Sequence, residues 1–125
     1  MSEVSTSSAT VAIVDYDGPV RLALLRLLRS EGLSGRAYGS ATEFLSDLEL
    51  SHPACVVLDV HMPDIGGLDL QQRLAREWPR LPVIMMTGQH SPENELKVRS
   101  LHPADFLLKP IDGDALIRAI RAAIG

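Results

Sequence analysis

Residues 54–67 read ACVVLDVHMPDIGG, an apolar run that ends in Asp59 and is followed by a turn. The unbroken run from Ala54 to Leu58 is typical of a buried strand. Pro63 and the pair Gly66-Gly67 predict a loop after it. The stretch therefore delivers one carboxylate to the mouth of a buried strand, and this placement indicates a functional site.

Three other strand-like runs also end in a polar side chain. These runs, with the residue that follows each, are 10–14 (Asp15), 83–86 (Thr87) and 105–108 (Lys109). Asp17 comes close behind Asp15. Four strand ends therefore carry polar chemistry.

Amphipathic segments alternate with the strands. Including a weaker candidate at 33–38, the strands are 10–14, 33–38, 54–58, 83–86 and 105–108. Five helices are expected between and after these strands. The first begins after Asp17 and ends at Gly32, and the second begins at the capping box Ser40 to Glu43. The third spans 68–78, the fourth begins at Ser91 and ends before Pro103, and the fifth spans 115–124. This alternation predicts an α/β fold, a doubly wound five-stranded parallel sheet with helices on both faces.

Length and composition point to one intracellular domain. The chain has 125 residues, of which 46% are hydrophobic. We predict a disordered tail at residues 1–8 and one domain at 9–125. No run approaches the roughly 20 apolar residues of a membrane span, and the first residues are not those of a signal peptide. We therefore expect a cytoplasmic protein without membrane contact.

Charge and cysteine content exclude other classes of site. Cys55 is the only cysteine and lies in an apolar run, so we interpret it as a core residue. The formal net charge of -4 argues against direct nucleic-acid binding by this domain. The arginines of the first predicted helix, Arg21, Arg26 and Arg29, are interpreted as a solvated face.

Strand ends of a parallel sheet meet at one edge. Right-handed crossovers place all carboxyl ends on the same side, so Asp15, Asp59, Thr87 and Lys109 can meet there. Clustered oxygen ligands without histidine or cysteine favour Mg²⁺. A carboxylate beside this ion, a hydroxyl and an ammonium is equipped to accept a phosphoryl group. Asp59 is the predicted nucleophile.

Several motifs together resemble the receiver domain of two-component response regulators. They are Asp15 after an apolar strand, VLDVHMPD at 57–64 with Gly66-Gly67, MMTG at 85–88 and FLLKP at 106–110. The resemblance spans residues 11–124 and implies the flavodoxin-like receiver fold. It also implies a phosphorylation-controlled switch that receives phosphate from a sensor histidine kinase or phosphotransfer protein, with at most self-catalysed phosphorylation and dephosphorylation.

The resemblance also implies a role for individual residues. They are the phosphoacceptor Asp59, the Mg²⁺-holding acid Asp15, the hydroxyl of Thr87, the ammonium of Lys109, the rotating aromatic Phe106 and the metal-binding backbone carbonyl of His61. The isomer of the Lys109–Pro110 bond is left open by the sequence.

One position departs from the family pattern. The family usually has two adjacent acids after the first strand, whereas this chain has Asp15-Tyr16-Asp17. A phenol is a poor metal ligand at neutral pH, so Mg²⁺ binding is expected to be weakened. Asp17 is either a substitute ligand or the N-cap of the following helix.

Two alternatives to the switch remain. One is a degenerate receiver that acts as a phosphorylation-independent interaction module. The other is a phosphatase of the haloacid dehalogenase type, because Asp15 to Gly18 resembles the opening motif of that family. Chain length opposes this alternative, and it would leave Asp59 unexplained.

The sequence says less about what the switch controls. The motifs most resemble receivers of nitrogen-fixation and nitrate regulators, which carry helix-turn-helix DNA-binding domains. We therefore expect control of transcription through an effector domain outside this chain, and a chain that is a stand-alone receiver or part of a longer regulator. A homodimer through the fourth helix, fifth strand and fifth helix is possible. Only Leu96, Val98 and Leu101 anchor the polar fourth helix, which predicts a mobile element.

Overall fold

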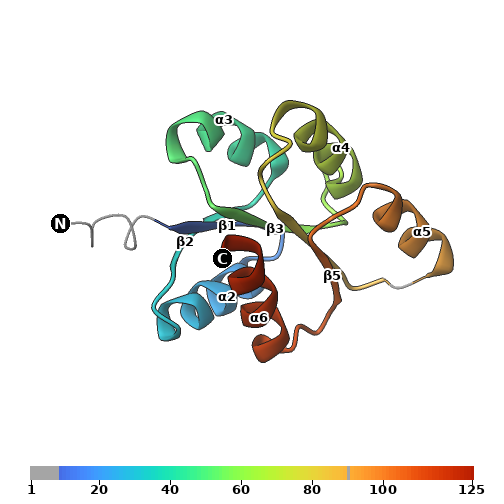
Figure 1. The fold of residues 1–125 in the computed structure, drawn as a ribbon. Coiled ribbons are helices and arrows are strands. Elements are labelled where there is room, and N and C mark those ends of the chain that lie inside the picture. Colours follow the sequence, from blue (N-terminus) through green and yellow to red (C-terminus); the bar gives the residue numbers. More distant parts are fainter. Residues whose placement is uncertain (1–8, 90) are drawn as a thin grey trace.

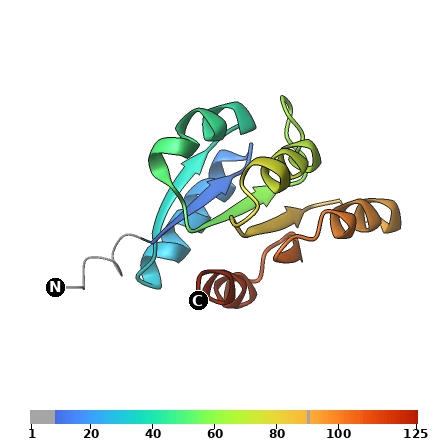
Figure 2. The ribbon, with the colours of Figure 1, turned by 45° about the horizontal axis from the view of Figure 1, so that its top comes forward.

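The computed structural model describes residues 9–89 and 91–125, so the predicted tail at residues 1–8 lies outside the described residues. Its centre is one five-stranded sheet in the order β2-β1-β3-β4-β5 (Figure 1). The strands are β1 (Thr10–Val14), β2 (Ser34–Tyr38), β3 (Cys55–Asp59), β4 (Val83–Thr87) and β5 (Asp105–Leu108). Every neighbouring pair is parallel, and the strand arrows run in one direction (Figure 2).

Five helices cover the two faces of the sheet. They are α2 (Gly18–Ser30), α3 (Ala41–Ser51), α4 (Gly67–Glu77), α5 (Pro92–Ser100) and α6 (Gly113–Ile124). Helices α3, α4 and α5 pack on one face, and α2 and α6 on the other (Figure 1). The predicted doubly wound fold is confirmed.

Side-chain caps explain where the helices begin. The Asp17 carboxylate accepts a hydrogen bond from the backbone N–H of Val20 at the start of α2. Ser40 and Ser91 cap α3 and α5 in the same way. Helix α6 begins at Gly113, two residues before the predicted start, because Asp112 accepts bonds from the next exposed backbone N–H groups.

The core consists of two apolar layers, one on each side of the sheet. Successive residues of β1 alternate between them: Ala12 and Val14 face α3 and α4, whereas Val11 and Ile13 face α2 and α6. Strands β3 and β4 are buried throughout. Cys55 is buried in the α2–α6 layer, as predicted, and burial raises the pKa of its thiol to about 12.

Helix α5 buries fewer of its apolar side chains than the sequence predicts. Val98 is its only buried side chain among the described residues, whereas Leu96 is 71% exposed. Positions two apart on a helix lie about 200° apart, so Leu96 and Val98 cannot both face the sheet. The prediction that Leu96 anchors this helix was wrong.

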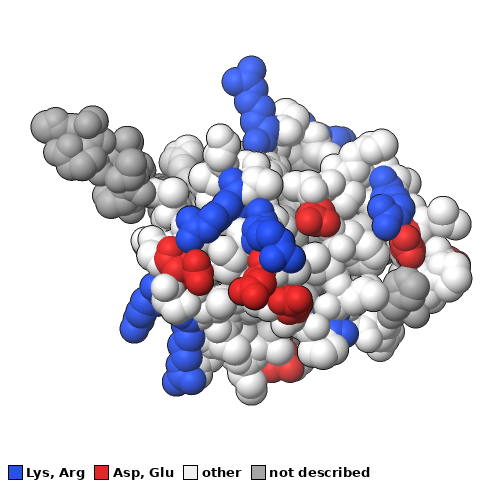
Figure 3. Space-filling model, turned by 60° about the horizontal axis from the view of Figure 1, so that its bottom comes forward, with Lys and Arg blue, Asp and Glu red and all other residues white. Residues whose placement is uncertain are grey.

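The surface carries charges of both signs. On the face formed by α2 and α6, lysine and arginine side chains lie beside acidic ones (Figure 3). One pair there joins Arg121 of α6 to Glu31 at the end of α2, with a distance of 3.2 Å between Nη2 and Oε1. No helix in the described part of the chain is long and apolar enough to cross a membrane.

Candidate functional site

The polar strand ends gather at one edge of the sheet. Asp15 directly follows β1, Asp59 ends β3, Thr87 ends β4 and Lys109 directly follows β5. Asp15 and Thr87 are buried, and Asp59 is only 6% exposed. The parallel topology therefore delivers two carboxylates, a hydroxyl and an ammonium to neighbouring strand ends.

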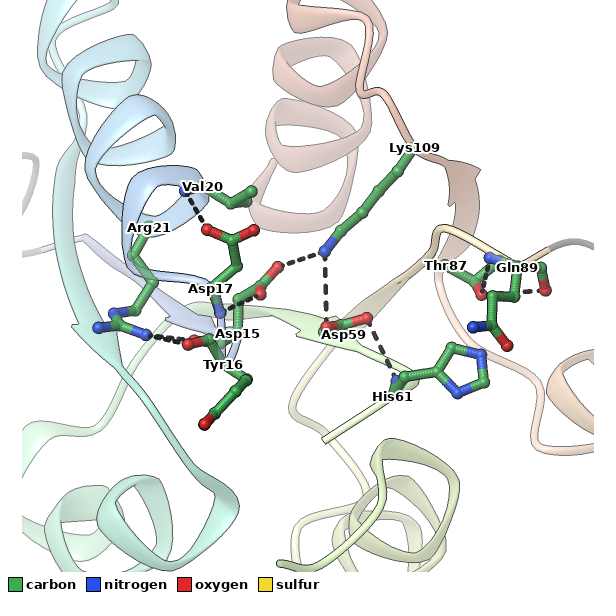
Figure 4. A network of polar contacts seen from close by, with 10 residues as sticks. All are labelled: Asp15, Tyr16, Asp17, Val20, Arg21, Asp59, His61, Thr87, Gln89 and Lys109. Atoms are coloured by element: carbon green, nitrogen blue, oxygen red, sulfur yellow. Dashed lines mark hydrogen bonds and ion pairs between the residues drawn. The ribbon is translucent and has the colours of Figure 1, made fainter. Parts of the chain in front are cut away.

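Lys109 joins the two carboxylates. Its Nζ lies 2.7 Å from Oδ2 of Asp15 and 3.5 Å from Oδ2 of Asp59 (Figure 4). Burial alone would lower the pKa of Lys109, but the bond with Asp15 and the charges of both acids raise it above the ordinary value. Lys109 is therefore a fully charged ammonium at neutral pH.

Asp59 is a carboxylate in an unfavourable environment. Burial raises its pKa, and the charge of Asp15 raises it further. The backbone N–H of His61, which donates to Oδ1 of Asp59 at 3.2 Å, and the ammonium of Lys109 oppose this shift. The His61 ring points away from Asp59 (Figure 4). A cation or a covalent partner that removes negative charge from Asp59 would relieve this destabilisation.

Gly67 permits the close approach of α4 to the site. A Cβ at Gly67 would overlap the carbonyl oxygen of Asp59 and lie 2.7 Å from Cα of Val60. The Gly67 N–H donates to the carbonyl of Val60 at 2.9 Å. The sequence indicated only a loop here, although the Gly66-Gly67 pair was the available signal for this contact.

In the loop after β1, the side chain of Asp15 points into the site, whereas those of Tyr16 and Asp17 point away from it. The backbone N–H of Asp17 donates to Oδ1 of Asp15 at 2.9 Å, and the Asp17 carboxylate points to Val20 as the cap of α2 (Figure 4). Tyr16 is 64% exposed, and its ring points away from Asp15 and Asp59. Asp17 therefore occupies its capping role in this structure.

Arg21 differs from the interpretation of a solvated face. Its Nη1 donates to the backbone carbonyls of Asp15 and Tyr16 at 2.7 and 3.0 Å. The interpretation was wrong for Arg21, because a helical pattern does not show that a long side chain folds back over the preceding loop.

Thr87 and Phe106 are not part of the charged cluster. The Thr87 hydroxyl donates to the carbonyl of Gln89 at 3.3 Å and accepts from its N–H at 3.1 Å. Among the hydrogen bonds of residues 9–89 and 91–125, none joins Thr87 to Asp59. Phe106 is half-buried and packs against the α3–α4–α5 layer. The Lys109–Pro110 bond, left open by the sequence, is cis.

Comparison with known proteins identifies the family. A family model described as the response regulator receiver domain matches residues 11–121. The chain belongs to this family. Its members are signalling domains, so membership decides against the haloacid dehalogenase alternative.

The curated relatives of this receiver domain are response regulators. It is 36% identical over 124 residues to the response regulator protein TodT of Pseudomonas putida, which covers 99% of this chain and 55% of TodT. It is 39% identical over 118 residues to the transcriptional regulatory protein FixJ of Azorhizobium caulinodans, covering 94% of this chain and 56% of FixJ. The receiver domain thus spans about half the length of the curated relatives it matches.

Solved receiver structures agree with the fold. The crystal structure of FixJ-N has a TM-score of 0.84 and 30% sequence identity, and the match covers 93% of both chains. A receiver protein from Pseudomonas putida has a TM-score of 0.86 and 28% identity, covering 91% of this chain and 96% of the other.

Receiver domains generally bind Mg²⁺ at a cluster of acidic residues. Within the described ranges no group of three His, Cys, Asp or Glu side chains forms a metal site. Mg²⁺ nevertheless often takes one or two carboxylates, keeps several waters and adds phosphate oxygens. Asp15 and Asp59 supply the two carboxylates of such a smaller donor set, and Tyr16, whose ring points away from both (Figure 4), does not join it.

Proposed function

We propose that Asp59 accepts a phosphoryl group from a histidine kinase or phosphotransfer protein. The observation that carries the proposal is the Lys109 ammonium held between the buried carboxylates of Asp15 and Asp59. An Asp59 oxygen attacks phosphorus, the bond from phosphorus to the donor imidazole breaks, and the imidazole leaves with the electron pair of that bond.

Each neighbour has a defined part in this proposal. Lys109 balances charge on the phosphoryl oxygens, and Asp15 holds Lys109 in place. Asp15, Asp59 and the His61 carbonyl are the residues that would hold Mg²⁺, which when bound supplies further positive charge to the phosphoryl oxygens. In this proposal phosphorylation and its reversal by water are at most self-catalysed.

The proposed switch begins at Thr87. Its hydroxyl is bonded to the backbone of Gln89, so it must exchange these bonds to reach a phosphoryl group on Asp59. This movement would make room for the half-buried ring of Phe106 to turn inward. The two side chains are the proposed link between the site and the surface of α5, β5 and α6.

An apolar pocket beside Lys109 is the proposed contact for the phosphate donor. It has a volume of about 440 Å³ and is lined by α2 and by the segment after β5, including Pro110 and Ile111. A protein that delivers phosphate to Asp59 must cover this side of the site, and apolar contact there would exclude water from the transfer.

The output is proposed by comparison with the relatives. FixJ is a transcriptional regulatory protein, and this domain matches about half of it. We infer that this receiver controls transcription in the cytoplasm through an effector domain, with homodimerisation through α5, β5 and α6 as the switched contact. The exposed side chains of Leu96 and Leu108 lie on these elements.

A phosphorylation-independent interaction domain is the second candidate, favoured by Tyr16 in place of an acid. Intact-mass spectrometry after incubation with acetyl phosphate and Mg²⁺ separates the two. A gain of one phosphoryl group that is lost in Asp59→Asn supports the switch, whereas no gain at high Mg²⁺ supports the second candidate.

Comparing the Mg²⁺ affinity of Tyr16→Asp with that of the natural chain tests the argument that Tyr16 weakens Mg²⁺ binding, and equal affinities would refute it.

A further inference from the structure

Arg21 reaches back from the first turn of α2 to the loop that carries Asp15. One nitrogen, Nη1, donates to the carbonyls of both Asp15 and Tyr16 (Figure 4). Hydrogen bonds from a charged donor are stronger than those from a neutral one. Arg26, on the same helix, is exposed instead.

Two glycines leave the space that the Arg21 guanidinium occupies. A Cβ at Gly39 would lie 3.3 Å from Nη1, and one at Gly18 would lie 3.5 Å from Nη2. Gly39 follows Tyr38, whose carbonyl accepts from the N–H of Asp15 at 3.1 Å. Arg21 therefore lies where α2, the end of β1 and the turn after β2 come together.

The two carbonyl contacts constrain the side chains of the loop. The carbonyls of Asp15 and Tyr16 belong to the two peptide planes that flank Tyr16, and the bond from the Asp15 N–H to the Tyr38 carbonyl restrains the plane before Asp15. Together these bonds restrain the direction of the Cα–Cβ bond at both residues. In the observed arrangement the Asp15 carboxylate meets Lys109 and the N–H of Asp17, while Tyr16 projects outward. Because Tyr16 supplies no second acid, the site depends on the orientation of Asp15 alone in this loop.

We propose that Arg21 is a positioning residue of the phosphoacceptor site. It holds the Asp15 carboxylate in its observed orientation toward Lys109, in which Asp15 would also serve as a ligand for Mg²⁺, and it keeps Tyr16 outside the site. This inference rests on the proposed function. Arg21 acts only through the backbone of Asp15 and Tyr16 and touches no reacting atom.

The test is a Mg²⁺ titration of the full chain followed by ¹H–¹⁵N NMR, without phosphorylation. Arg21→Met is expected to weaken Mg²⁺ binding about tenfold or more, the usual scale for losing a residue that orients a metal ligand. Arg21→Lys, which keeps the charge but has no planar fork, is expected to lie between Arg21→Met and the natural chain. Arg26→Met removes the same charge from the same helix and is expected to bind as the natural chain does.

Thermal denaturation of each variant separates positioning from stability. A lower melting temperature of Arg21→Met with unchanged Mg²⁺ affinity would show a merely structural role and overturn the proposal. If Arg21→Met does not fold, Arg21→Lys decides, and unchanged affinity in that variant has the same meaning.

If the natural chain binds no Mg²⁺, the metal part of the proposed function is contradicted. The positioning role of Arg21 is then tested by the NMR signal of a backbone amide. The Asp17 amide, which donates to Asp15, must then shift in Arg21→Met and stay in place in Arg26→Met. An unchanged Asp17 signal in Arg21→Met would overturn the inference about Arg21.

Discussion

At the scale of single residues, one ammonium faces two acids. Lys109 contacts Asp15 more closely than Asp59, so the charge of Asp59 is only partly compensated. Burial and then the charge of Asp15 raise the pKa of Asp59, and the partial contact with Lys109 does not cancel this shift. A carboxylate that is destabilised in the folded protein releases free energy when it reacts or binds a cation. The same destabilisation lowers the free energy of unfolding.

Asp59→Asn is expected to stabilise the domain at neutral pH. The raised pKa of Asp59 favours the neutral carboxyl in the folded state, so its contribution is fully present below the unfolded pKa of about 4 and is lost as pH rises through the folded pKa. Asparagine is neutral throughout. We expect a free energy of unfolding about 1 kcal/mol higher at pH 7, a gain that shrinks toward pH 3, measured by urea denaturation.

The exposed acid Glu49 provides the matched control for this experiment. Glu49→Gln should leave the free energy of unfolding within about 0.5 kcal/mol of the natural chain. An Asp59→Asn variant that is no more stable than Glu49→Gln at pH 7 would show that the site does not destabilise the charged carboxylate.

Gly67→Ala is expected to disturb the site through the backbone. The added methyl group would overlap the Asp59 carbonyl oxygen, whereas at Gly66 the nearest atom to a new Cβ is Oδ2 of Asp69, 4.0 Å away. We expect Gly67→Ala to lose about 1–3 kcal/mol of unfolding free energy. Phosphorylation by acetyl phosphate should slow in parallel.

Gly66→Ala is the neighbouring control, because the added group comes no closer than 4.0 Å to its nearest neighbour, the Asp69 carboxylate. It should retain the natural rate of labelling by acetyl phosphate in an intact-mass assay. If both substitutions slow labelling equally, the effect comes from general stiffening of the loop and not from contact with Asp59.

At the scale of elements, Asp17 has to be assigned to a helix cap or to the metal. It caps α2 in the structure, and serine is an equally good cap without a carboxylate. Asp17→Ser is expected to keep both stability and Mg²⁺ affinity, and Asp17→Ala to lose about 1 kcal/mol of unfolding free energy at unchanged Mg²⁺ affinity. A loss of Mg²⁺ binding in Asp17→Ser would instead assign Asp17 to the metal.

Helix α5 is expected to open more readily than the other helices. Only Val98 is buried on it, whereas α6 buries Leu116, Ile117, Ala119 and Ile120. Few buried contacts give a low free energy of local opening. Amide hydrogen exchange should therefore be faster at 95–100 than at 117–124, and equal protection of the two helices would contradict this expectation.

At the scale of the whole molecule, the parallel sheet keeps the polar site apart from the apolar core. Both faces are closed by helices, so the polar site lies at the edge where the strands end. The α5–β5–α6 side is the less completely buried one, since every residue of β5 retains some exposure. It is therefore the side on which a change at the site can alter contacts with another molecule.

Phosphorylation is expected to promote self-association through this side. Leu96 is exposed on α5, so Leu96→Glu should prevent association by placing a charge in the apolar contact. The measurement is sedimentation velocity with and without acetyl phosphate. Leu22 is 50% exposed on α2 and serves as the control, because Leu22→Glu should associate normally. Normal association of Leu96→Glu would place the contact elsewhere.

The sequence by itself determined the order of strands and helices and the edge at which the polar residues meet. Apolar runs such as 54–58, Gly and Pro punctuation and capping residues each report a local preference, and right-handed parallel connections turn these preferences into one topology. Asp15, Asp59, Thr87 and Lys109 could therefore be selected, and their roles in phosphoryl transfer stay predictions.

Only the tertiary structure decided which of these side chains touch. Lys109 meets Asp15 across 94 positions of sequence, Arg21 folds back over its own loop, Tyr16 turns outward and Leu96 faces solvent. Sequence periodicity specifies which residues share a face, but it does not specify the direction of a long side chain or the turn of a loop peptide. Those depend on the space and the hydrogen-bonding groups that distant segments supply once they have packed together.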